Sequence, residues 1–438
     1  MPHPNPLVRN IATLLGDARL LDLARQTGFL VRQRDLQVVP FFWTLVLGMI
    51  AQPTDTIAGL QRLYHQLTGV TLASSSFQAR FNAGLVAWLR AAFDHVVAAT
   101  GEERRQLAGP LASFRELLVT DSTVLRLHAL LAGKYPGTRT NHSPAQAKLN
   151  VLYNVASGRI VTSQVAAGTR SETRLFTPGA WVKGALLLFD LGYFKLQTFW
   201  RIDFHEGYFI SRLKDGCNPT IKAIHSTHRG RAIDVVGKKL KDVLGALHRQ
   251  TLDAQVAYTI SRKGLPGRPR SDRKTEVLSL RLVAHLNPET GRYHLYVTNI
   301  PPEMLTAQGV ADAYRLRWQV ELLFKELRSI GGLDAWPNRK EAVVLAGIYA
   351  TLLGMAVNRR LLLAIRERLE ADPTKQARTI GPMRWTNVFA AHAGLFLGLI
   401  LGTVKQTHQQ ARSFVTMLLR EAVDPKRAKP RQGVICAC

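Results

Sequence analysis

One carboxylate in this chain lies among several cationic and aromatic side chains at helical spacing. The stretch YRLRWQVELLFKELRSIGG, residues 314–332, contains Glu321. At about 100° per residue its polar side chains fall within an arc of about 80°, and leucine, valine and isoleucine occupy the opposite face. The pattern predicts one amphipathic helix whose polar face carries Tyr314, Arg317, Glu321, Lys325 and Arg328.

Two interpretations of Glu321 fit this spacing. Arg317 and Lys325 lie one turn away on either side, so Glu321 could simply pair with them. Each such exposed pair contributes a few tenths of a kcal/mol to a helix. Alternatively, Glu321 is one member of a set of acids that binds a metal ion.

Two aspartates elsewhere in the sequence follow strand-like runs. The apolar run ELLVT ends at Asp121, and the continuous apolar run ALLLF ends at Asp190. Open α/β sheets gather functional side chains at strand ends. We therefore expect Asp121 and Asp190 to lie at one edge of a sheet, within reach of Glu321.

Three converging carboxylates suit the hydrolysis or transfer of a phosphodiester. Two Mg²⁺ ions about 3.5–4 Å apart can activate the attacking oxygen and stabilise the leaving one. Mg²⁺ prefers a few carboxylates and keeps water and substrate oxygens as its other ligands. Carboxylates alone would repel the phosphate, so neighbouring Arg317, Lys325 and Arg328 would offset that repulsion and hold phosphates.

The charge of the whole chain points to a polyanionic partner. Its 438 residues carry 58 Lys plus Arg against 31 Asp plus Glu, a net charge of +27. Nucleic acid is the commonest such partner, and a membrane surface is the alternative. The N-terminus lacks a secretory signal pattern, and the apolar run 343–357 is shorter than the roughly 20 residues of a membrane span, so we expect a buried helix there. Three cysteines are too few for a disulfide framework and indicate a reducing cytosol.

The first hundred residues are predicted to be helical. One helix ends at Gly69 and a second begins near Ser75, with Gln78 as a capping-box partner. The spacing fits a helix-turn-helix or an ordinary helical hairpin equally well. In the first case Ser76, Gln78 and Arg80 would face DNA.

Strands dominate the middle of the chain. Residues 148–168 are predicted to form two strands about a Ser157–Gly158 turn, and residues 207–216 are predicted to form a further strand. Arg212 and Lys214 follow that strand and could contact phosphates. Residues 217–292 are predicted to be a β-rich insertion with a basic loop whose cations are Arg262, Lys263, Arg268 and Arg270, although charge clusters are usually just solvated surface.

The motifs together resemble a known enzyme family. The spacing Tyr314-x2-Arg317-x3-Glu321-x6-Arg328, with TDSTVLRL around Asp121 and FDLGYFK around Asp190, is similar to the insertion-sequence-four family of DDE transposases. The resemblance covers roughly residues 115–335. One position departs from the family, because Arg328 stands where the last motif has lysine; arginine keeps the charge and adds a bidentate donor fork.

The resemblance implies an α/β fold with an RNase H-like catalytic core, a β-rich insertion, and helical regions at both ends. Asp121, Asp190 and Glu321 would be the catalytic acids that bind Mg²⁺, with Mn²⁺ able to substitute. Tyr314 and Arg317 would place Glu321 and the DNA backbone, and Lys325 would contact phosphate. Family members cut both strands at element ends and join the 3′-hydroxyls to target DNA, some through a hairpin with a flipped base.

Two aromatic residues are candidates for stacking on such a base. Tyr293 begins the strand that leads out of the insertion, and Trp318 lies beside the polar face of the predicted helix. The competing interpretation is that both are packing residues, which is the commoner role of a strand tyrosine.

These inferences predict an organisation and a setting for the protein. The predicted regions are a helical DNA-binding region (1–105), two parts of the catalytic core (106–216 and 293–335) around the insertion (217–292), a helical region (336–425) and a basic tail (426–438). We expect double-stranded DNA as partner, a homodimer on DNA, no membrane, and a cytoplasmic, nucleoid-associated location. The alternatives are a metal-dependent endonuclease without strand transfer and a non-catalytic repressor derived from a transposase.

Overall fold

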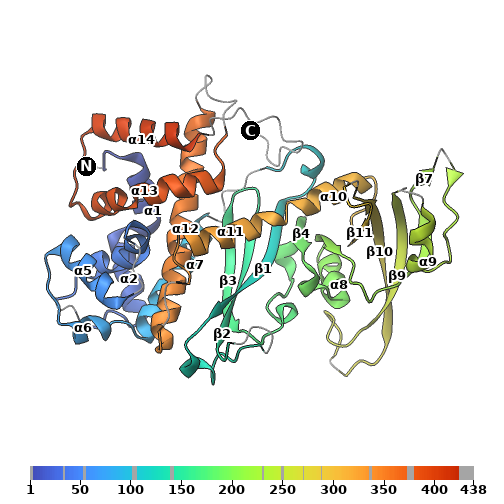
Figure 1. The fold of residues 1–438 in the computed structure, drawn as a ribbon, viewed down its shortest axis with the longest axis horizontal. Helices are drawn as coiled ribbons and strands as arrows, with labels where there is room; N and C mark the ends of the chain where they lie inside the picture. Colours follow the sequence, from blue (N-terminus) through green and yellow to red (C-terminus); the bar gives the residue numbers. More distant parts are fainter. Residues whose placement is uncertain are drawn as a thin grey trace.

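The structure is a computed structural model of the chain. It describes residues 3–32, 35–52, 56–100, 106–138, 143–228, 231–247, 251–269, 271–287, 289–334, 338–371 and 379–423, without the side chains of residues 228 and 232. The basic tail 426–438 and Arg270 therefore lie outside the described residues. The prediction of an α/β fold is confirmed, because a large mixed sheet is flanked by helices from both ends of the chain (Figure 1).

Helices fill the described part of the first hundred residues. Asn5 caps the first helix by accepting a hydrogen bond from the backbone N–H of Leu7, and Gly69 ends the fifth helix in the left-handed conformation at φ +70°. The helices are α1 (Pro6–Leu15), α2 (Asp17–Gln26), α3 (Val38–Trp43), α4 (Met49–Ala51), α5 (Ile57–Thr68), α6 (Ser74–Gln78) and α7 (Ala83–Thr100).

The helix after Gly69 differs from the predicted one. Helix α6 has only five residues, and no side chain caps its N-terminus, so the predicted capping box is absent. The long helix of this region, α7, starts only at Ala83. Phe77 is fully buried among aromatic rings, and this packing rather than capping fixes the short helix.

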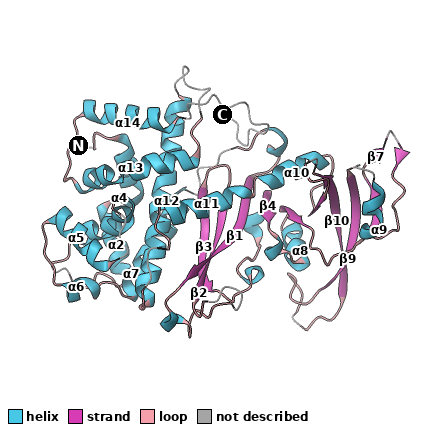
Figure 2. Cartoon of the chain, viewed as in Figure 1, coloured by secondary structure: helices cyan, strands magenta, loops and turns pink. Residues whose placement is uncertain are grey.

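A sheet of nine strands forms the middle of the molecule, in the order β3-β2-β1-β4-β5-β11-β10-β9-β6 (Figure 2). Strands β1, β4 and β5 are parallel, and the other neighbouring pairs are antiparallel. The strands are β1 (Glu116–Arg126), β2 (Gln146–Asn154), β3 (Arg159–Ala167), β4 (Ala185–Phe189), β5 (Tyr208–Arg212), β6 (Thr220–Ile224), β9 (Leu252–Ser261), β10 (Thr275–Leu286) and β11 (Tyr293–Thr298).

The strands of residues 217–292 extend the main sheet. Strands β6, β9 and β10 continue it beyond β11, while β7 (Thr227–His228) and β8 (Arg231–Ala232) make a separate small ribbon next to α9 (Leu240–Leu244). The segment is β-rich as predicted, but its strands join the sheet of the core. Buried Arg281 fastens this part, since its guanidinium pairs with Asp253 at 2.6 Å and donates to the carbonyls of Ile300 and Leu305.

The remaining helices pack on the two faces of the sheet. Helix α8 (Leu196–Phe204) packs on one face, and α10 (Ala307–Arg315) and α11 (Trp318–Ser329) cross the other. Helices α12 (Glu341–Glu370), α13 (Pro382–Leu401) and α14 (His408–Ala422) lie beside the N-terminal helices at one end of the molecule (Figure 1).

Alternation along the central strands divides the interior into two hydrophobic cores. Leu186 and Leu188 of β4 belong to the core shared with the terminal helices and α11. Leu187 and Phe189 face the second core with α8. Because β4 is buried on both faces, its sequence reads as one apolar run.

Helix α12 is the buried helix predicted from the apolar run 343–357. It is long and apolar enough to cross a bilayer by length and composition alone, and 78% of its most apolar window is buried inside the protein. The core helix of a folded domain passes the same test, so the burial is consistent with the predicted interior role.

A buried ion pair joins α11 to the C-terminal helices. Arg359 of α12 pairs with Glu326 of α11, with side chains 3% and 1% exposed. Thr386 of α13 donates to the same carboxylate at 2.9 Å. A buried charge is tolerated only when it is paired, so this contact fixes where α11 sits against the helical end.

Replacing Arg359 by methionine should leave the Glu326 charge in the core without its cationic partner. We expect Arg359→Met to lower the free energy of unfolding by about 3–5 kcal/mol, measured by urea denaturation with circular dichroism. Arg368→Met, at an exposed position of the same helix, should change it by less than about 0.5 kcal/mol. Equal stability of the two variants would contradict a structural role for the pair.

Candidate active site

The register of two parallel strands brings Asp121 and Asp190 together. Pairing of β1 with β4 runs from Glu116 opposite Ala185 to Thr120 opposite Phe189. Asp121 and Asp190 are the next residue on each side, so they lie adjacent where the parallel ladder stops. Asp190 follows its strand as predicted, but Asp121 does not, because β1 continues to Arg126 through antiparallel pairing with β2.

The environment of Asp121 disfavours its ionised form. Burial raises the pKa of Asp121 to about 6, and the nearby charges of Asp190 and Glu172 add to that rise. The backbone N–H of Ser122, which donates to Asp121 Oδ1 at 2.7 Å, and the guanidinium of Arg317 act in the opposite direction. The pKa of this carboxyl is therefore closer to neutral pH than that of an ordinary aspartate, and neighbouring cations favour its charged form.

Arg317 connects the aspartates to Glu321. Its Nη1 lies 3.5 Å from Asp121 Oδ2, and its Nη2 lies 2.5 Å from Glu321 Oε1. Burial lowers the pKa of Arg317, but the hydrogen bond to Glu321 and the charges of Tyr314, Asp190 and Glu321 outweigh it and raise that pKa. One guanidinium thus bridges Asp121 and Glu321, and the charge of Asp190 also acts on it. Glu321 also pairs with Arg317 four residues before it, as the simpler interpretation predicted for that partner.

The expected single helix is two helices. Helix α10 ends at Arg315 and α11 begins at Trp318, with Leu316 and Arg317 in a turn between them. Leu316 and Arg317 keep right-handed helical dihedral angles, but their N–H groups bond to carbonyls three residues back. This tighter turn rotates α10 relative to α11, so the face calculated for a continuous α-helix does not hold for Tyr314. That residue is 9% exposed and its hydroxyl donates to the carbonyl of Phe189 at 3.2 Å, directly before Asp190.

The two cations farther along α11 have different surroundings. Lys325 is exposed. Arg328 donates to the hydroxyl of Thr123 at 2.6 Å and to the carbonyl of Val124, and its other amino group lies 3.5 Å from Asp334. Arg328 thus ties the end of α11 to β1 while its side chain is still 41% exposed.

A cationic cavity opens beside Arg317. It measures about 570 Å³ and contains an exposed indole, that of Trp318, which is 57% exposed. Burial lowers the pKa of His285 and of His294, and neighbouring arginine charges lower both further, which reflects a positive environment. The lining residues are Arg212, His285, Asn287, Glu289, His294, Tyr296, Tyr314, Arg315, Arg317 and Trp318.

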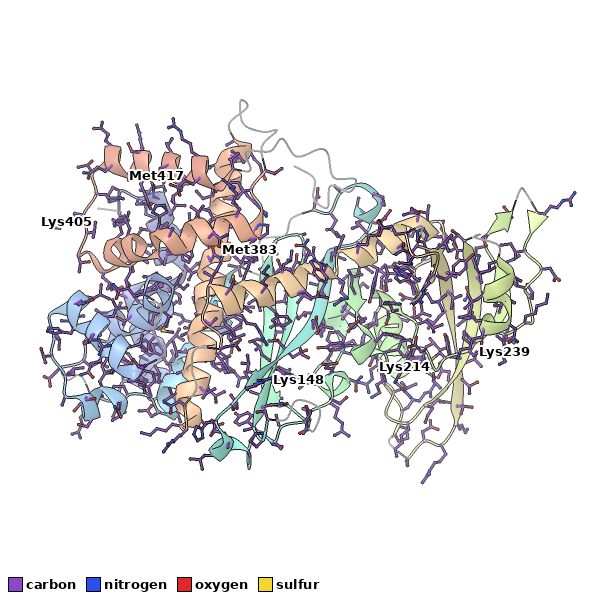
Figure 3. The ribbon with its side chains drawn as sticks, in the orientation of Figure 1. Lys148, Lys214, Lys239, Met383, Lys405 and Met417 are labelled. Carbon is purple, nitrogen blue, oxygen red and sulfur yellow. The ribbon has the colours of Figure 1, made fainter. Side chains whose placement is uncertain are left out.

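The other predicted contact residues lie in several places. Arg212 lines the cavity, and Figure 3 shows Lys214 toward the β9 end of the molecule. Tyr293, at the start of β11, packs against the second core. Gln78 is exposed at the end of α6, while Arg80 follows that helix in a turn and is half-buried. Gln78 and Arg80 thus belong to the helical end, separate from the acids.

In the basic loop of the insertion, Arg262 is already paired with Asp272 at 3.4 Å. The predicted phosphate contact of Arg262 would therefore have to compete with that carboxylate.

A fourth carboxylate near the aspartates was missed in the sequence. Glu172 lies in a short 3-10 turn, accepts a hydrogen bond from Ser122 at 2.7 Å, and pairs with Lys148 at 3.4 Å. It follows no strand and belongs to no periodic pattern, so the sequence carried no signal for it. Only the pairing of β1 with β2 and the return of the loop bring these side chains together.

The carboxylates of this site are suitable ligands for a hard divalent cation, but they are not arranged around one point. Asp121, Asp190 and Glu321 offer the carboxylate oxygens that Mg²⁺ and Mn²⁺ prefer. Among the described residues, however, no three His, Cys, Asp or Glu side chains are already arranged around one point. Arg317 lies between Asp121 and Glu321 instead, so a metal ion would have to replace its guanidinium.

The chain is similar to several known transposases. The chain is 24% identical over 401 residues to the transposase for insertion sequence element IS231F of Bacillus thuringiensis subsp. israelensis, covering 85% of this chain and 83% of that protein. It is 23% identical over 363 residues to the transposase for element IS1151 of Clostridium perfringens, covering 77% and 76%. A stretch of 65 residues is 43% identical to the putative transposase InsL for element IS186A of Escherichia coli (strain K12), covering 15% and 18%.

A solved structure is similar over most of the chain. The piggyBac transposase in a synaptic complex with hairpin DNA covers 95% of this chain and 85% of its own, with 8% identity and a TM-score of 0.46. The family model for the transposase DDE domain matches residues 112–356, more than half of the 438 residues and the whole span that holds Asp121, Asp190 and Glu321. The chain therefore belongs to the transposase DDE domain family and is a DDE transposase.

Proposed function

We propose that this protein is the transposase of an insertion sequence of the insertion-sequence-four family. In this proposal it binds the terminal inverted repeats, cleaves DNA at the element ends and joins the 3′-hydroxyls to target DNA. The observation that carries the proposal is the β1–β4 register, which sets Asp121 beside Asp190 within reach of Arg317 and Glu321. The order β3-β2-β1-β4-β5, antiparallel and then parallel, supports an RNase H-like core.

Asp121, Asp190 and Glu321 would hold two divalent cations, Mg²⁺ or Mn²⁺. Bound there, the cations supply Lewis-acid activation of the attacking oxygen and neutralise charge on the phosphate. Arg317 now neutralises Asp121 and Glu321. A DNA phosphate offers this guanidinium another anion, so DNA binding would draw Arg317 away and leave the carboxylates free for the cations.

Other residues would hold the DNA around the cut. Lys325 is exposed on the helix of Glu321, and Arg212 lines the cationic cavity beside Arg317. Tyr314 would act indirectly, by holding the carbonyl before Asp190. Arg328 and Lys214 would contact phosphates, and Gln78 and Arg80 would contact DNA from the helical end, with the net charge of +27 drawing the duplex in.

An unpaired base would fit the cavity beside the acids. Trp318 offers an exposed indole there, next to the Arg317 that faces the acids. Stacking on an aromatic ring contributes roughly 1–3 kcal/mol per base. Tyr293 remains a second candidate, although its packing against the core favours Trp318.

We propose further that the protein acts as a homodimer on double-stranded DNA, without a membrane, in the cytoplasm and associated with the nucleoid. Two alternatives use the same structure. An endonuclease would cut the ends without joining them, and a repressor would bind the ends without cutting. The presence of all three acids with Arg317 among them favours catalysis over repression.

Removing the Glu321 charge should abolish cutting while DNA binding persists. The substrate is a plasmid carrying the gene with its native flanking DNA, incubated with Mg²⁺. We expect wild type to nick both flanks, leaving 3′-hydroxyls that join target DNA, and Glu321→Gln to nick at least about 100-fold more slowly. Glu367→Gln, exposed on α12, should match wild type. If wild type binds the DNA but does not cut it with any metal, the result would favour the repressor. If wild type cuts without joining, the result would favour the endonuclease.

The pKa of Asp121 predicts a pH dependence of metal binding. Because that pKa lies near 6, protons compete with the cation for this carboxylate only below that pH. We expect the Mn²⁺ concentration for half-maximal nicking to be constant above about pH 6. Below about pH 6, the required Mn²⁺ concentration should rise about tenfold for each pH unit. The rate at saturating Mn²⁺ separates this effect from loss of folded protein, and an unchanged requirement down to about pH 4.5 would contradict it.

Trp318→Ala should remove stacking in the cavity. With end DNA carrying 2-aminopurine at the terminal position, we expect wild type and Trp318→Phe to quench its fluorescence and Trp318→Ala to leave it bright. Trp181, also exposed but packed on Phe176 away from the cavity, provides the matched control as Trp181→Ala. If Trp318→Ala still quenches the 2-aminopurine fluorescence fully and Tyr293→Ala does not, the stacking role belongs to Tyr293.

A further inference from the structure

Glu172 contacts the strand that carries Asp121. Its Oε1 accepts a hydrogen bond from the Ser122 hydroxyl at 2.7 Å, and the backbone N–H of the same serine donates to Asp121 Oδ1 at 2.7 Å. The serine is thus held by its side chain while its backbone orients the neighbouring carboxylate. Through Ser122, Glu172 restrains the direction in which Asp121 presents its oxygens.

Glu172 also contacts the turn that follows Asp190. A Cβ added to Gly192 would lie 1.9 Å from Glu172 Oε2, so the carboxylate rests directly on this glycine's backbone. Gly192 belongs to the 3-10 turn Leu191–Tyr193, which starts immediately after Asp190. The Tyr193 hydroxyl donates to Asn150 of β2 and fixes the far side of the turn. One side chain therefore touches both acid-bearing segments.

A cation makes this carboxylate tolerable so close to other acids. Lys148 of β2 lies 3.4 Å from Glu172 Oε1, and its side chain is only 12% exposed. Figure 3 shows Lys148 on the part of the sheet formed by β1, β2 and β3. The lysine charge offsets that of Glu172, and Glu172 in turn satisfies a largely buried ammonium. Its Oε1 accepts from both Ser122 and Lys148, and its Oε2 lies against Gly192, so we assign Glu172 to supporting the acids rather than to binding a metal itself.

We propose that Glu172 is a positioning residue of the active site, holding Asp121 and Asp190 at the separation that metal binding and strand cleavage require. The inference rests on the proposed function and adds a residue to it. Partners that orient ligating carboxylates typically change metal affinity or activity by 10- to 100-fold when they are lost. The effect of Glu172 should therefore appear in the chemical step and in metal affinity, while DNA affinity stays the same.

The first test replaces Glu172 in the full-length protein. We expect Glu172→Ala to slow single-turnover nicking about 10- to 100-fold at saturating DNA, with an unchanged dissociation constant for end DNA in EDTA. Electron paramagnetic resonance of Mn²⁺ with the protein–DNA complex should show an affinity weakened by a similar factor. Ser122→Ala, a smaller change that removes the same hydrogen bond, should weaken both by about tenfold and serves if Glu172→Ala folds poorly.

Glu341 provides a matched control. It is 28% exposed against 27% for Glu172, and it likewise pairs with a lysine, Lys134 at 2.6 Å, and accepts from a hydroxyl, that of Tyr135. Glu341→Ala should leave nicking and Mn²⁺ affinity at wild-type values. A loss equal to that of Glu172→Ala would show that any such ion pair matters only through stability, and would overturn the positioning role.

Gly192→Ala tests the second contact. The added methyl group should displace the Glu172 carboxylate and slow nicking about as much as Glu172→Ala. In the double variant the methyl group has no carboxylate to displace, so the two effects should not multiply. Multiplying effects would contradict the contact, and wild-type rates and Mn²⁺ affinity in Glu172→Ala would overturn the proposal. If wild type binds Mn²⁺ but cuts no DNA, the proposed function fails and Mn²⁺ affinity still tests Glu172.

Discussion

Burying a carboxylate beside other acids disfavours its charged form, mainly through the loss of water and further through repulsion, and that cost governs the middle of this protein. The register of β1 with β4 leaves no freedom in where Asp121 and Asp190 lie. The pKa of Asp121 is raised to about 6, chiefly by burial and to a smaller extent by the charge of Asp190. The surrounding groups offset this cost: a backbone N–H from Ser122 and a guanidinium from Arg317 both favour the charged carboxylate.

The third acid depends on contacts far from the sheet edge. Glu321 comes from a helix that must be held at a fixed place, and the buried pair of Glu326 with Arg359 ties that helix to α12. At the other end, Arg281 fastens the segment before α10 to the extended sheet. The break between α10 and α11 lets Tyr314 reach the carbonyl before Asp190 while Arg317 turns toward the acids. The helical end and the extended sheet therefore both serve the site.

The sequence was sufficient for the parts of the site that follow from local pattern. The uniform apolar run of β4 identified Asp190 as a residue at a strand end, and the amphipathic stretch identified Glu321. It was insufficient where pairing decides. Asp121 lies within a strand because β2 pairs along its whole second half. Periodicity predicted one helix through Arg317, since a two-residue turn barely disturbs the spacing of apolar residues. Glu172 had no local signal, because only tertiary folding brings its loop to Ser122 and Gly192.

The central claim is that the three acids bind divalent cations once DNA draws Arg317 away. The most direct test is a structure of the protein with end DNA and Mn²⁺, using the anomalous signal of manganese to locate the metal. The account predicts manganese bound by Asp121 and Asp190, with Glu321 among the ligands and Arg317 on a phosphate. A DNA complex with the end in place, Arg317 still between Asp121 and Glu321, and manganese elsewhere would contradict it.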